Sequence, residues 1–163
     1  MPEPTRPLLA VDVDGVISLF GFEQLPEGVP TRFEMIGGLM RCISTGTGAR
    51  LRRLAEDFDL VWATGWEGRA NQLAEILEVP EYPYLTFDGA ARFGSSDWKL
   101  EALGDYAAGR ALAWVDDCFE ERISAWAAAR EEPTLLMATE SHLGLQDVHV
   151  EALTGWAAGL AAE

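Results

Sequence analysis

Three continuous apolar runs, each ending in polar residues, constrain the fold of this chain most strongly. They occupy residues 7–13, 59–65 and 111–115, and none of them alternates apolar with polar positions. A run of this kind is typical of a strand buried on both faces, as in a parallel sheet covered by helices. Further strands are predicted over 84–87 and 133–138.

Helical spacing of apolar residues fills the segments between these strands. The helices are predicted over 46–58, 68–78, 98–108, 120–130 and 147–160. Strands that alternate with helices predict an α/β domain with a doubly wound parallel sheet. Two apolar-rich arms around Gly37-Gly38 predict a β-hairpin within residues 31–43.

Length and charge limit the classes of function. The 163 residues suffice for one domain, which we expect to fill the chain after a disordered lead-in over residues 1–6. The chain has 12 basic and 27 acidic residues, and its net charge of −15 repels phosphate backbones and anionic lipid. Membrane partners and autonomous binding to nucleic acid are therefore not expected.

The cysteine content also limits the classes. Cys42 and Cys118 lie far apart, and the start of the chain shows no secretion signal. These features argue against a disulfide framework or a zinc site, and they predict a cytoplasmic protein. Cys118 follows two acids, which would raise the pKa of its thiol, so no reactive thiolate is expected there.

Four acids stand where two of the predicted strands end. Asp12 and Asp14 close the first run, and Asp116 and Asp117 follow the third. In a parallel sheet the ligand site lies beyond the carboxyl ends of the strands, so these side chains are expected at one rim. Carboxylates that close repel one another unless a cation or shared protons compensate them. A few hard oxygen ligands suit Mg²⁺, which often binds phosphate as well.

Two further residues complete a predicted phosphoryl-transfer site. Thr64 ends the second buried run, and Lys99 lies at the start of a predicted helix. A hydroxyl and a cation beside a carboxylate-bound metal ion are groups that stabilise a transferring phosphoryl group. Arg69 and Arg92 are rivals of Lys99 for the cationic role.

The order of these residues resembles the four motifs of the haloacid dehalogenase (HAD) superfamily. The segment Asp12 to Val16, after a buried strand, matches the first motif, and Thr64 matches the second. Lys99 matches the third motif and Asp116-Asp117 the fourth, so the resemblance covers residues 7–140.

The resemblance implies a role for each matched residue. Asp12 would be the nucleophile that attacks phosphorus and becomes an aspartyl phosphate. Asp14 would be the general acid for the leaving oxygen and then the base for the hydrolytic water. Thr64, the backbone at Gly65 and the ammonium of Lys99 would bind the phosphoryl oxygens.

The same resemblance implies the ligands of Mg²⁺. They would be Asp12, the backbone carbonyl of Asp14, and Asp116 or Asp117, with the choice between the last two left open. A carboxyl at position 14 favours a phosphatase or phosphotransferase, because dehalogenation needs no proton for a leaving oxygen. The alternative of a calcium loop would need an oxygen ligand two residues beyond Asp14, where the chain has Val16.

The stretch over residues 16–45 is too short for a full cap domain, so we expect a hairpin flap over an open site. Trp66, after the second motif, is a candidate for contact with substrate, although a tryptophan there more often packs in the core. The stretch 61–67, with Asp116-Asp117 and Trp126-Ala127, is also similar to small bacterial HAD-like proteins related to phosphatase modules of RNA-repair proteins.

Together these features predict a Mg²⁺-dependent phosphomonoester hydrolase that acts on a small molecule or on a macromolecular end. One alternative is a phosphatase that processes nucleic-acid ends. Another is a HAD-like binding or regulatory module with little turnover. The sequence leaves the physiological substrate and the oligomeric state open.

Overall fold

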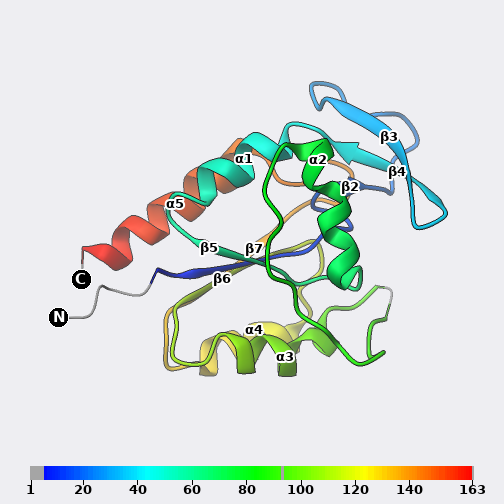
Figure 1. Ribbon diagram of the computed structural model, residues 1–163. Helices are drawn as coiled ribbons and strands as arrows, with labels where there is room; N and C mark the ends of the chain where they lie inside the picture. Colours follow the sequence, from blue (N-terminus) through cyan, green and yellow to red (C-terminus); the bar gives the residue numbers. More distant parts are fainter. Residues whose placement is uncertain (1–5, 93, 163) are drawn as a thin grey trace.

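The computed structural model describes residues 6–92 and 94–162, in which a parallel sheet lies between two layers of helices (Figure 1). The sheet contains β1 (Leu8–Val11), β5 (Asp59–Trp62), β6 (Leu112–Asp116) and β7 (Thr134–Ala138). One face is covered by α1 (Thr47–Leu54) and α5 (Asp147–Ala161), and the other by α3 (Leu100–Tyr106) and α4 (Glu121–Ala129). The predicted α/β class is confirmed, whereas the predicted lead-in lies almost wholly outside the described residues.

The register of the sheet brings the carboxyl ends of its strands to one edge. The strand order is β5-β1-β6-β7, and all three pairings are parallel. Val11, the last residue of β1, lies opposite Trp62 of β5 and Val115 of β6. The polar residues that follow these strands therefore start from the same edge of the sheet.

The central strand β1 is buried on both faces, which explains why its sequence does not alternate. Leu8, Leu9, Ala10 and Val11 are each 1% exposed or less. Leu9 and Val11 belong to the core cluster under α1 and α5, whereas Leu8 and Ala10 belong to the cluster under α3 and α4. Each fully buried leucine or valine contributes about 1.5–3 kcal/mol, so both layers depend on this strand.

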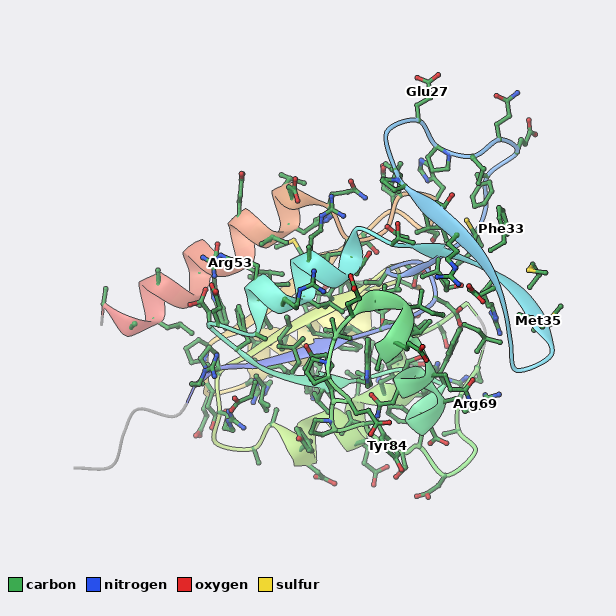
Figure 2. The ribbon with its side chains drawn as sticks, turned by 45° about the horizontal axis from the view of Figure 1, so that its top comes forward. Glu27, Phe33, Met35, Arg53, Arg69 and Tyr84 are labelled. Carbon is green, nitrogen blue, oxygen red and sulfur yellow. The ribbon has the colours of Figure 1, made fainter. Side chains whose placement is uncertain are left out.

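A small antiparallel sheet forms the predicted flap at the carboxyl edge of the parallel sheet (Figure 1). It consists of β2 (Ser18–Leu19), β3 (Thr31–Ile36) and β4 (Leu39–Ser44), in the order β2-β4-β3. Gly37 and Gly38 join β3 to β4 with φ angles of +62° and +80°, which the tight two-residue turn requires. Phe33 and Met35 point away from the core (Figure 2).

The strand predicted over 84–87 is wrong, because this segment forms only an isolated bridge between Tyr84 and Trp62. Its neighbours Pro80 and Pro83 have no backbone N–H, so they cannot extend a hydrogen-bonded ladder. The helix predicted over 68–78 is present in another form. It starts as a 3-10 segment, η1 (Glu67–Leu73), and continues as one α-helical turn, α2 (Ala74–Leu77).

The helix predicted over 98–108 also starts as a 3-10 turn, η2 (Asp97–Lys99), before α3. Among the described residues, no helix combines the length and the apolar character that crossing a lipid bilayer requires.

Candidate functional site

Asp12 and Asp116 lie side by side at the carboxyl edge of the sheet. Asp12 directly follows β1, and its backbone N–H donates to the carbonyl of Val115 at 3.0 Å. Asp116 is the last residue of β6. Both side chains belong to buried residues, which are 7% and 0% exposed. The parallel register thus places two carboxylates next to each other in a setting with little water.

Asp117 joins these two acids in a carboxylate triad. One carboxylate oxygen from each of Asp12, Asp116 and Asp117 lies within 4.8 Å of the others. Oxygens on opposite sides of an octahedral Mg²⁺ are about 4.2 Å apart, so small side-chain movements would bring these donors to an ion. The donor set is therefore chemically suited to a hard divalent cation.

Lys99 is enclosed with the triad. Its Nζ lies 2.6 Å from Oδ2 of Asp116 and 3.2 Å from Oδ1 of Asp12, and the residue is 2% exposed. Burial alone would lower the pKa of Lys99, but the charges of Asp12 and Asp116 outweigh burial and raise it. When all three carboxylates are ionised, the triad and the ammonium together carry two uncompensated negative charges, which equal the charge of a divalent cation in magnitude.

Two acids of the triad, Asp12 and Asp117, hold their protons more tightly than free carboxyl groups do. Burial raises the pKa of Asp12 well above its ordinary value, with Lys99 opposing this effect and Asp116 adding to it. Burial and a hydrogen bond with Asp116 raise the pKa of Asp117 to about 6, although the hydroxyl of Ser141 opposes the shift. A cation that binds to the triad would therefore displace protons.

The two adjacent acids at the end of β6, Asp116 and Asp117, have different partners. Oδ2 of Asp116 faces Lys99, and its Oδ1 accepts hydrogen bonds from the Ser96 hydroxyl at 3.1 Å and the Cys118 N–H at 3.2 Å. Oδ2 of Asp117 accepts a hydrogen bond from the Ser141 hydroxyl at 2.9 Å. Donors therefore fix both oxygens of Asp116, which orients it toward Lys99.

The turn after β1 comes very close to Asp117. Gly15 has a φ angle of +80°, and a Cβ atom added there would lie 2.3 Å from Oδ2 of Asp117. The hydroxyl of Thr139, just after β7, donates to the Gly15 carbonyl at 2.8 Å and fixes this turn. Only glycine permits both this backbone conformation and this close approach.

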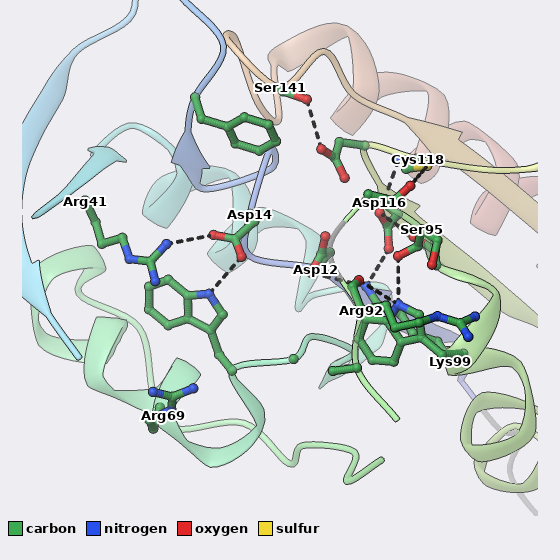
Figure 3. Close-up of a pocket in the computed structure, with 18 residues that line it drawn as sticks. Asp12, Asp14, Arg41, Arg69, Arg92, Ser95, Lys99, Asp116, Cys118 and Ser141 are labelled. Carbon is green, nitrogen blue, oxygen red and sulfur yellow. Dashed lines mark hydrogen bonds and ion pairs between the residues drawn. The ribbon is translucent and has the colours of Figure 1, made fainter. Parts of the chain in front are cut away.

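Asp14 stands apart from the triad, although its side chain lines the same cavity (Figure 3). Its Oδ2 accepts a hydrogen bond from the indole N–H of Trp66 at 3.1 Å, and its Oδ1 lies 3.4 Å from the Arg41 guanidinium. Trp66 is 7% exposed, and the Arg41 guanidinium lies 4.8 Å from the centre of the indole ring. The contact of Trp66 with substrate stays a prediction.

Thr64 and Gly65 form the turn that follows β5. Thr64 is buried, and its Oγ1 accepts a hydrogen bond from the Trp66 backbone N–H at 3.1 Å. Gly65 lines the cavity. Binding of phosphate by this turn stays a prediction.

A cavity of about 500 Å³ opens over the carboxyl edge. Its wall includes Asp12, Asp14, Lys99 and the guanidinium-bearing residues Arg41, Arg69 and Arg92. Of the three candidate cations, Lys99 lies between Asp12 and Asp116, whereas Arg69 and Arg92 do not. The arginines instead line the outer part of the site, where Arg92 forms an ion pair with Asp97 at 2.7 Å.

Several residues of the site were missed in the sequence. Ser141 and Thr139 follow β7, and their place beyond the carboxyl end of a predicted strand was a signal for them, since ligand sites of parallel sheets lie there. Arg41 lies on the hairpin, where its inward face follows only from the exact register. Burial and the Glu120 carboxylate raise the pKa of the Cys118 thiol to about 11, as expected for an unreactive cysteine.

Comparison of the chain with protein-family models and with curated protein sequences finds no match. The established facts are thus an α/β fold, a parallel sheet in the order β5-β1-β6-β7, and a buried acidic triad at its carboxyl edge.

Proposed function

We propose that the protein belongs to the HAD superfamily and hydrolyses phosphomonoesters with Mg²⁺ through an aspartyl phosphate. The observation that supports this best is the separation of two acids that are only two residues apart. Asp12 lies in the triad beside Lys99, whereas Asp14 is held outside the triad. A nucleophile needs a neighbouring cation that favours its ionised form, whereas a proton donor is better placed away from that cation.

Asp12 is the nucleophile in this proposal. One of its carboxylate oxygens forms a bond to phosphorus while the bond from phosphorus to the leaving oxygen breaks. In the second half of the reaction, water attacks phosphorus and the bond from phosphorus to Asp12 breaks, which regenerates the carboxylate. The ammonium of Lys99, 3.2 Å from Asp12, offsets negative charge that builds up during both halves.

Asp14 moves the protons. It donates a proton to the leaving oxygen in the first half and accepts one from the attacking water in the second. Its side chain is 40% exposed, so it can exchange protons with solvent between turnovers.

The residues that would hold Mg²⁺ are Asp12, Asp117 and the backbone carbonyl of Asp14. Asp117 is preferred to Asp116 because donors engage both oxygens of Asp116. Asp116 would then orient Lys99. When bound, the ion supplies a positive charge that shields the transferring phosphoryl group.

The test is hydrolysis of p-nitrophenyl phosphate with Mg²⁺, with EDTA, and after Mg²⁺ is restored. We expect turnover that EDTA abolishes and Mg²⁺ restores. Asp12→Asn should reduce the rate to background and keep the circular dichroism spectrum of the wild type. A variant that retained the wild-type rate would remove Asp12 from the role of nucleophile, and no turnover on any phosphomonoester would favour a binding module.

A further inference from the structure

Two arginines line the side of the cavity that is nearest the flap. Arg41 comes from β4 and Arg69 from η1, and both line the same cavity as Asp12 and Lys99. In Figure 3 they lie on the opposite side of Asp14 from Lys99. A Cβ atom added to Gly37, in the turn of the flap, would lie 3.3 Å from Nη1 of Arg69. The two guanidinium groups thus bridge the flap and the core.

The charges of these arginines are poorly compensated within the protein. Across residues 6–92 and 94–162, Arg69 has no carboxylate within ion-pair distance, whereas Arg92 is paired with Asp97. Arg41 reaches Asp14 only at 3.4 Å, and its buried Nε has no hydrogen-bond partner among the described residues. In a chain with a net charge of −15, two such cations beside an acidic cluster are available to an anionic ligand.

The place of these arginines indicates which part of a substrate they meet. Arg41 contacts Asp14, which in the proposed function protonates the leaving oxygen. A group bound by Arg41 and Arg69 therefore belongs to the leaving group and not to the transferred phosphoryl group. Guanidinium groups bind phosphate through paired, charge-assisted hydrogen bonds.

We propose that Arg41 and Arg69 form a second anion subsite that binds a further phosphate on the leaving group. This inference rests on the proposed function and names its substrate class, phosphomonoesters whose alcohol carries a second phosphate. That phosphate can belong to a compact bisphosphate or to the neighbouring phosphodiester of an oligonucleotide end. The net charge of −15 favours the compact source, because a long polyanion is repelled by the rest of the surface.

The test compares phosphate release from adenosine 3′-phosphate, adenosine 5′-phosphate and adenosine 3′,5′-bisphosphate. The wild type should prefer the bisphosphate by about tenfold or more in kcat/KM, the effect of a hydrogen-bonded charge pair. Arg69→Gln should bring this ratio close to one. The matched control is Arg53→Gln, which removes an arginine of α1 that is paired with Glu56 and Asp57, far from Arg69 in Figure 2. The control should keep the wild-type ratio.

The outcomes separate this inference from the proposed function. If p-nitrophenyl phosphate is hydrolysed but the ratio is near one, or if Arg69→Gln keeps the preference, the subsite is refuted and the function stands. If nothing is hydrolysed, calorimetry of the same nucleotides with Asp12→Asn still tests the subsite, and equal affinities would refute it. A long oligonucleotide with a terminal phosphate distinguishes the sources, since a preference for it that added salt removes would assign the second phosphate to a phosphodiester.

Discussion

The indole N–H of Trp66 and the guanidinium of Arg41 hold the two oxygens of the Asp14 carboxylate, and the indole gives the shorter contact. The Asp14 side chain is 40% exposed and would otherwise rotate between several positions. Trp66 is itself held, because it is buried and its backbone N–H donates to Thr64. Trp66 therefore acts as a positioning residue for the proposed proton donor, whether or not its ring also meets the substrate.

Replacement of Trp66 by phenylalanine keeps a ring and removes the N–H donor. We expect kcat for phenyl phosphate to fall about tenfold or more, with a smaller change in KM, because one hydrogen bond to a charged group is lost. The fall should be smaller for p-nitrophenyl phosphate, whose leaving oxygen needs little protonation. Asp14→Asn should show the same pattern, and an equal fall for both substrates would contradict a positioning role.

Among the structural elements, the turn between β1 and β2 packs directly against the Asp117 carboxylate. This turn is held by Thr139 at the Gly15 carbonyl and by a hydrogen bond from the Gly15 N–H to the Ser18 carbonyl at 2.8 Å. A side chain on Gly15 would collide with the Asp117 carboxylate.

We expect Gly15→Ala to destabilise the fold by about 1–2 kcal/mol, the strain of a positive φ angle, and also to weaken activation by Mg²⁺. Gly21→Ala is the matched control, because Gly21 has a φ angle of +78° and open space around its Cβ position. The control should lower the melting temperature and keep the Mg²⁺ dependence of hydrolysis. If both variants respond alike to Mg²⁺, the contact with Asp117 is unimportant.

Elements that are determined by the residues within them could be predicted from the sequence. The β1 run is apolar throughout because helices cover both faces, and Gly37-Gly38 specifies the hairpin by its backbone alone. The convergence of Asp12 and Asp116 also follows, since strand order and direction determine which strand ends meet.

Features that depend on contacts between residues far apart in the sequence could not be predicted. The bond from Trp66 to Asp14 joins residues 52 positions apart, and no local pattern marks it. The segment after Pro83 forms only a bridge with Trp62, although its residues alternate between exposed and buried, because Pro83 has no N–H with which to extend the pairing. Arg52 of α1 donates hydrogen bonds to the Leu77 and Glu78 carbonyls, and the helical spacing of residues 46–58 does not reveal this contact.

At the scale of the whole molecule, the triad makes stability depend on pH. The pKa of Asp117 rises from 3.8 to about 6 on folding, so the metal-free fold binds this proton more tightly than the unfolded chain does. The resulting stabilisation is full below pH 3.8 and is lost as the pH rises through about 6. Above that pH the ionised Asp117 carboxylate opposes folding unless a cation compensates it.

Asp117→Asn should therefore melt at a higher temperature than the wild type at pH 8 in EDTA, with roughly half that difference at pH 5, where the folded protein keeps the Asp117 proton and the unfolded chain has lost it. Added Mg²⁺ should raise the melting temperature of the wild type at pH 8 and have less effect on the variant. Calorimetric scans at both pH values measure these shifts. A variant that is less stable than the wild type at both would show that Asp117 is not a source of electrostatic strain.

The central place of β1 has a consequence for the order in which the molecule opens. The backbone of β1 is hydrogen-bonded to a strand on each side, and the strand lies between the two hydrophobic cores. In contrast, β3 is the outer strand of the flap and is largely exposed. Amide hydrogens of β3 should thus exchange with deuterated solvent long before those of β1. Fluctuations that loosen the flap leave the anchor of Asp12 intact, so the cavity can open while the carboxylates at the sheet edge keep their positions.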